Sequence, residues 1–152
     1  MDKVKIESFK AIGISVRTTN KNGQGAKDIG NLWGRFMNEK IAEAIPNKID
    51  NTVYSIYTGY ESDHTAPYTT ILGCRVANLD DVPEGMIGKS IEGGDYIKLS
   101  AKGDLTKGLI ADKWAEIWNM DLNRVFTADF EVYGAKAQNP ENAEVDIYIA
   151  VK

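Results

Sequence analysis

The chain contains two amphipathic helical patterns, and each is preceded by one alternating segment and followed by two. In the first pattern, apolar residues recur every three or four positions from Ile29 to Ile45, and Pro46 ends it. The second pattern is shorter, and its members are Leu109, Ile110, Trp114, Ile117 and Trp118. An order of strand, helix, strand, strand that occurs twice favours a sheet carrying two helices.

Apolar residues alternate with smaller or polar ones around both helices, which is typical of half-buried strands. The first strand starts near Phe9 or Ala11, and the others are expected at residues 53–60, 69–76, 96–101, 126–133 and 145–151. Residues 80–94 are rich in turn formers and predict a linker between two halves. Asp104 or Thr106 is placed to cap the second helix.

Matching positions in the two halves indicate a duplication. The first helix carries Trp33 where the second carries Trp114, each followed by an apolar residue three positions later. We therefore expect an α+β fold of two βαββ units, about residues 1–80 and 90–152, related by a pseudo-twofold axis. The units would share an antiparallel sheet with two main helices, and a central ligand cleft is expected where they meet.

Composition narrows the class of protein. The 152 residues are enough for one compact domain, 1–152, with its own core. Lys and Arg total 18 against 22 Asp and Glu, so we expect no direct nucleic-acid partner. The single cysteine, Cys74, and single histidine, His64, disfavour a disulfide framework or a zinc site. No apolar run typical of a membrane span is present, and a cytoplasmic protein is expected.

Glu131 is the residue that stands out chemically. It lies in a predicted strand whose other face is continuously apolar, and its own face carries Asp129 and Tyr133. The last strand offers Tyr148, so we expect a carboxylate and two phenols to converge on one surface. A partly desolvated carboxylate among aromatic rings is unfavourable unless a cation or a proton neutralises it. The alternative is an ordinary solvated strand face.

The two ways of neutralising Glu131 correspond to two functions. An organic cation would add cation–π attraction of roughly 0.5–2 kcal/mol per contact to the charge pairing. With a raised pKa, the carboxyl group would instead serve as a general acid or base. Other patterns are weaker: Glu61, Asp63 and His64 lack a further close metal ligand, and the turn at residues 23–25 lacks the glycine spacing of a nucleotide-binding loop.

Several of these segments resemble those of the GyrI-like family, the bacterial transcription-activator effector-binding domains. The resemblance covers essentially the whole chain, and it rests on the two tryptophan-containing helices and on residues 57–61, 68–76, 94–96, 129–133 and 145–149. It implies a duplicated βαββ fold with a central ligand cleft. Such domains occur in multidrug-responsive regulators and as free-standing proteins, and this chain resembles the free-standing form.

In this family a glutamate at the pocket centre engages cationic aromatic ligands, and Glu131 is the matching position. We therefore predict a stand-alone small-molecule binding protein for amphipathic, preferably cationic aromatic compounds, with Glu131 as counter-ion. The other expected ligand-binding residues are Trp33, Phe36, Tyr60, Tyr96, Trp118, Tyr133 and Tyr148. No catalytic residue, metal or cofactor is assigned. Two alternatives stay open: a hydrolase of reactive xenobiotics that uses the same glutamate, and a protein-interaction module, either gyrase-inhibitor-like or the sensor subunit of a transcription regulator.

Overall fold

A single eight-stranded sheet runs through the computed structural model, which describes residues 3–152. Its strands are β1 (Lys3–Ile6), β2 (Phe9–Thr18), β3 (Val53–Thr58), β4 (Tyr68–Val76), β5 (Ile87–Ile91), β6 (Gly94–Gly103), β7 (Arg124–Tyr133) and β8 (Ala143–Val151). The α-helices are α1 (Gln24–Asn38), α2 (Ile41–Ala44) and α3 (Leu109–Trp118), and the short 3-10 turns are η1 (Lys21–Gly23), η2 (Leu105–Lys107) and η3 (Ala135–Ala137). The predicted α+β class and antiparallel sheet are confirmed.

The strand order, β1-β6-β8-β7-β3-β4-β2-β5, has the same pattern from either end. Each side contributes one strand before its helix and two after it, and the two sides pair through β3 and β7. The short edge strands cross over: β1 precedes β2 but pairs with β6, whereas β5 precedes β6 but pairs with β2. The seam between the two halves of the sheet is the β3–β7 pair.

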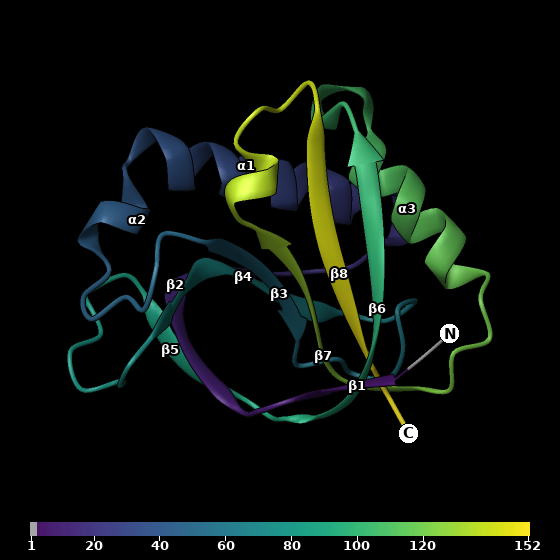
Figure 1. The fold of residues 1–152 in the computed structure, drawn as a ribbon, viewed down its shortest axis with the longest axis horizontal. Coiled ribbons are helices and arrows are strands. Elements are labelled where there is room, and N and C mark those ends of the chain that lie inside the picture. The colour runs from purple at the N-terminus through teal and green to yellow at the C-terminus, as the bar shows by residue number, and fades with distance from the viewer. Residues whose placement is uncertain (1–2) are drawn as a thin grey trace.

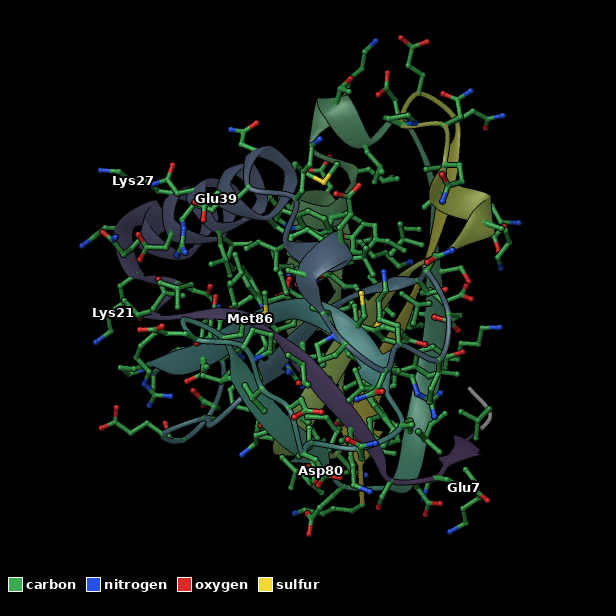
Figure 2. All side chains as sticks on the ribbon, turned by 90° about the vertical axis from the view of Figure 1, so that its left-hand side faces the viewer. Glu7, Lys21, Lys27, Glu39, Asp80 and Met86 are labelled. Carbon is green, nitrogen blue, oxygen red and sulfur yellow. The ribbon has the colours of Figure 1, made fainter. Side chains whose placement is uncertain are left out.

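Both longer helices lie on one side of the curled sheet (Figure 1). Under α1, Leu32 and Phe36 pack with apolar residues of β2 and β4, and under α3, Ile117 packs with apolar residues of β8. Figure 2 shows that Lys21, Lys27 and Glu39 extend away from the ribbon, while side chains fill the space between the helices and the sheet. Within residues 3–152, every helix is too short or too polar to cross a bilayer.

The other face of the sheet curls around a separate apolar core. Its buried members include Phe9, Tyr54, Ile56, Tyr96 and Phe130. The central part of the sheet is therefore covered on both faces, whereas the edge strands β1 and β5 each keep an exposed face. As a result β7, a strand with acidic residues on one face, lies in the covered centre of the sheet.

Some predicted boundaries were wrong for local reasons. The helix expected up to Ile45 ends at Asn38, because Lys40 takes a left-handed conformation with φ 52° before α2 begins. Residues 80–94, predicted as a linker, contain β5, and β1 was not predicted. Asp104 caps η2 by accepting the Thr106 backbone N–H, while α3 begins after Gly108.

Candidate functional site

Glu131 lies near the middle of the sheet and is only 1% exposed. Three neutral donors bind its carboxylate. The Tyr57 hydroxyl donates to Oε2 at 2.7 Å, the Trp114 indole N–H donates to Oε2 at 2.6 Å, and the Tyr133 hydroxyl donates to Oε1 at 2.5 Å. The carboxylate is therefore satisfied by hydrogen bonds but is not paired with a basic side chain in these contacts.

Three elements bring these donors together. Tyr133 is on the same face of β7 as Glu131, two residues further along the strand. On β3, Ser55 stands opposite Glu131, so Tyr57 reaches the carboxylate diagonally across the seam. Trp114 comes from α3, which is anchored to the sheet by the fully buried Ile117.

Aromatic rings from both helices surround the carboxylate. Trp33 of α1 meets Tyr133 edge-on with 4.9 Å between ring centroids, and Trp114 of α3 meets Tyr57 in the same manner at 5.4 Å. Trp33, Trp114 and Tyr133 are each partly exposed, although Glu131 is buried. A single layer of rings therefore separates the carboxylate from solvent at the junction of the two halves.

Burial sets the protonation of this group. Removal from water raises the pKa of Glu131, and the hydrogen bonds from Tyr133, Tyr57 and Trp114 oppose this shift only in part. Burial, together with the nearby Glu131 charge, raises the pKa of Tyr57 and of Tyr133 well above the usual tyrosine range. The two phenols therefore remain protonated and act as donors.

Asp129, two residues earlier on β7, is also fully buried but has different partners. Its Oδ2 accepts from Arg124 Nη2 at 2.7 Å and from the Tyr60 hydroxyl at 2.6 Å, and its Oδ1 accepts from the Ala150 backbone N–H at 2.9 Å. Burial and the Asp129 charge raise the pKa of Tyr60 well above its usual range. This carboxylate has its own buried cation, which Glu131 lacks.

The structure brings only part of the predicted ligand-binding set to Glu131. Tyr133 contacts the carboxylate, and Trp33 packs on Tyr133. Tyr60 binds Asp129 instead. Phe36 is buried below α1, 6.1 Å from Trp33 between ring centroids, and Trp118 is on the surface, stacked on His64 at 5.3 Å.

The prediction that Tyr148 shares a surface with Glu131 was wrong. In the β7–β8 pairing, Glu131 stands opposite Ile147 and Phe130 stands opposite Tyr148, so Tyr148 stacks on Phe130 at 4.9 Å on the other face. Tyr96 also lies on that inner face, packed against Phe130. Both rings are separated from Glu131 by the sheet itself.

Two residues that contact Glu131, Tyr57 and Trp114, were not in the predicted set. Tyr57 alternates along β3 with Ile56, which marks it as facing the same side as Ser55, but sequence does not give the pairing of β3 with β7. Trp114 was interpreted as part of the apolar stripe of its helix. It does pack there, and its indole N–H additionally reaches the carboxylate.

Comparison with known proteins identifies the family of this chain. The chain belongs to the Cass2 family of integron-associated effector-binding proteins, which matches residues 4–151. The resemblance to GyrI-like effector-binding domains is thereby confirmed. The family description names effector binding. One relative of this chain is described as a putative transcriptional regulator.

Three proteins show the similarity at different levels of sequence identity. The integron cassette protein VCH_CASS2 from the mobile metagenome of Vibrio cholerae is 32% identical, with a TM-score of 0.76 over 99% of this chain and 95% of its own. The putative transcriptional regulator protein YobU of Bacillus subtilis (strain 168) is 26% identical over 144 residues, which are 92% of this chain and 90% of YobU. SAV2435, solved with tetraphenylphosphonium, has a TM-score of 0.79 over 99% of this chain and 93% of its own; at 14% identity it shows the shared fold.

Proposed function

We propose that the protein binds amphipathic organic cations at the junction of its two halves, with Glu131 as the counter-ion. The observation that carries this proposal is a buried carboxylate whose partners are all neutral. Such a group is costly while it is charged, and a cation that is itself apolar can neutralise it without bringing water into the site.

The surrounding rings suit this ligand class. The layer of rings beside the carboxylate offers aromatic faces and edges from Trp33, Trp114, Tyr57 and Tyr133. A lipophilic cation would gain cation–π and stacking contacts from them in addition to charge pairing. The binding of tetraphenylphosphonium by SAV2435, a protein of the same fold, supports this choice of ligand.

Access to the carboxylate requires the aromatic layer to open. Trp114 and Tyr133 are the donors that are partly exposed, so they are the ones that a ligand meets first. We infer that the incoming cation displaces one or both of these donors and neutralises the charge of Glu131. By sequestering or sensing such compounds, the protein would act as an effector-binding unit, alone or beside a transcription regulator.

A hydrolytic function would use the same carboxylate as a general base, which its raised pKa favours. Both functions require a donor to move, because donors already occupy both carboxylate oxygens, and the aromatic rings beside Glu131 favour the binding of a cation. A water molecule would have to replace one of them before Glu131 could activate it. Recovery of a bound electrophilic ester in hydrolysed form, at a rate abolished in Glu131→Gln, would favour the enzyme.

Titration with tetraphenylphosphonium, followed by tryptophan fluorescence, tests the proposal. We expect saturable quenching from Trp33 and Trp114, and an affinity that falls by about 1–3 kcal/mol in Glu131→Gln. Trp118→Phe removes the surface tryptophan and should leave the quenching in place. Glu84→Gln, which removes an exposed carboxylate in the turn before β5, is the charge control. Equal affinity in the wild type and Glu131→Gln would rule out the counter-ion role.

A further inference from the structure

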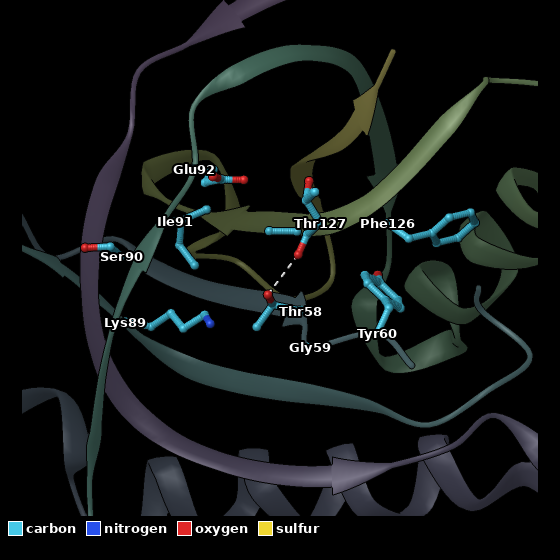
Figure 3. Close-up of a pocket in the computed structure, with 10 residues that line it drawn as sticks. Thr58, Gly59, Tyr60, Lys89, Ser90, Ile91, Glu92, Phe126 and Thr127 are labelled. Carbon is cyan, nitrogen blue, oxygen red and sulfur yellow. Dashed lines mark hydrogen bonds between the residues drawn. The ribbon is translucent and has the colours of Figure 1, made fainter. Parts of the chain in front are cut away.

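A cavity of about 320 Å³ lies between β5 and the adjoining ends of β3 and β7 (Figure 3). Ile91 and Ala128, which line it, belong to the core of the inner face, whereas Glu131 faces the helices. The cavity is therefore separate from the cation site proposed above. Its volume is at the lower end of the range for small-molecule sites.

One wall of the cavity is built at a cost in backbone strain. Phe126 has φ 57°, a left-handed conformation that is unusual for a bulky residue, and it lies where the β7–β8 pairing is interrupted between Arg124 and Asp129. Its ring packs edge-on against Tyr60 at 5.5 Å between centroids, and the Arg124 guanidinium lies 4.3 Å from its centroid. Strained residues of this kind concentrate at functional sites. Phe126 borders the cavity, and Figure 3 shows its ring directed away from Lys89 and Glu92.

Two opposite charges enter the same cavity from β5 and the turn that follows it. Figure 3 shows the Lys89 side chain directed towards Thr58 and the Glu92 carboxylate directed towards Thr127. Across residues 3–152, neither Lys89 nor Glu92 takes part in an ion pair. The backbone at Glu92 is held in place because its carbonyl accepts from the buried Tyr96 hydroxyl at 2.9 Å.

Hydroxyl groups complete the lining. Thr58 donates its hydroxyl proton to the Thr127 carbonyl at 2.9 Å, which leaves the Thr58 oxygen free to accept a hydrogen bond. The Thr127 and Ser90 side chains also border the cavity. The walls thus combine one ammonium group, one carboxylate, hydroxyl groups, two aromatic residues and the apolar side chains of Ile91 and Ala128.

We propose that this cavity binds a zwitterionic small molecule of the amino-acid class. The ligand carboxylate pairs with Lys89, its ammonium group pairs with Glu92, and its apolar side chain packs on Ile91 and Ala128, which line the cavity. A ligand that carries only one charge forms one ion pair fewer, with either Lys89 or Glu92, and therefore binds more weakly.

The test is a titration of the full chain, observed as amide chemical-shift changes by NMR, with L-phenylalanine, phenethylamine and 3-phenylpropanoate. The two analogues each lack one charge of the amino acid. We expect L-phenylalanine to bind with a dissociation constant on the order of millimolar and each analogue to bind about three- to tenfold more weakly. The shifts should map to Thr58, Ile91 and Thr127.

Lys89→Met and Glu92→Gln should each weaken the binding of L-phenylalanine by a similar factor. The fold should be retained in both variants, because both residues are exposed. The matched controls Lys107→Met and Glu84→Gln change exposed charges outside the cavity and should have no effect. Glu131→Gln should also leave this titration unchanged, which separates the result from the fate of the cation site. Equal binding of all three ligands, no saturable shift up to their solubility limits, or shifts centred on Trp114 and Tyr133 would each overturn the proposal.

Discussion

Asp129 and Glu131 are neighbours on one face of β7, yet they hold their buried charges in different ways. Asp129 is neutralised within the protein by Arg124, with Tyr60 and a backbone N–H completing its contacts. Glu131 receives hydrogen bonds only from two phenols and an indole. The difference separates a structural carboxylate from one that is available to a cationic ligand. A buried ion pair belongs to the fold, whereas a buried charge with neutral partners favours a cation from outside.

The largest effect on stability is expected at the ion-paired carboxylate. Asp129→Asn would leave Arg124 as a buried cation without its counter-charge, because its side chain is only 7% exposed. We expect the free energy of unfolding, measured by urea denaturation, to fall by about 3–5 kcal/mol. Asp95→Asn breaks the exposed ion pair with Lys5 and should change it little. A small loss in Asp129→Asn would mean that the pair is not structural.

Removing one tyrosine hydroxyl donor from each carboxylate should have the next largest effect on the free energy of unfolding. Tyr133→Phe leaves Glu131 Oε1 without its donor, so we expect a loss of about 1.5–3 kcal/mol. Tyr60→Phe should cost less, because Asp129 Oδ2 keeps its bond from Arg124. Urea denaturation of both variants measures the difference. A larger loss in Tyr60→Phe would reverse the assigned roles.

Glu131→Gln should affect the free energy of unfolding less than Asp129→Asn or Tyr133→Phe does. The amide keeps the shape of the side chain and removes a charge that burial disfavours, and the Tyr133 hydroxyl can turn to accept from the amide. We expect a change within about 1 kcal/mol at neutral pH, of either sign. A loss as large as that of Asp129→Asn would show that the Glu131 charge stabilises the fold.

The pH dependence of stability gives the smallest and most specific signal. Burial raises the pKa of Glu131 above its usual value of 4.5, so the folded state binds this proton more tightly than the unfolded state does. The stabilisation from the bound proton is complete below the unfolded pKa and is lost as pH rises through the folded pKa. The free energy of unfolding of the wild type, minus that of Glu131→Gln, should therefore fall as the pH rises from the unfolded pKa to the folded pKa. Above the folded pKa this difference should stay constant. A relative stability that rises with pH would contradict the raised pKa.

The periodic part of the fold could be predicted from sequence. Two helical stripes and six alternating segments predicted the strands and helices of both halves and their order, because burial of one face imposes a period on the chain. The edge strands β1 and β5 were missed for the same reason. β1 has four residues, and β5 leaves all but Ile91 exposed, so neither carries a clear pattern of buried positions.

The faces of the strands were the part that sequence could not settle. Alternation predicted correctly that Phe130 and Glu131 point in opposite directions. It did not predict which residues of β8 would share a face with each of them. Polar residues were assumed to share a face, and this placed Tyr148 beside Glu131. In the structure the sheet is covered on both sides, so Glu131 shares its face with Ile147 and Ile149, and donors from β3 and α3 satisfy it instead.

The most direct test of the central claim compares two ligands of nearly equal shape and opposite charge, tetraphenylphosphonium and tetraphenylborate, in the wild type and in Glu131→Gln. Calorimetry should show that the wild type prefers the phosphonium cation, and that the preference shrinks in Glu131→Gln. The wild-type affinity for the cation should also rise with pH as Glu131 loses its proton. A cation preference that is unchanged by the substitution, or equal binding of both ligands by the wild type, would contradict the account.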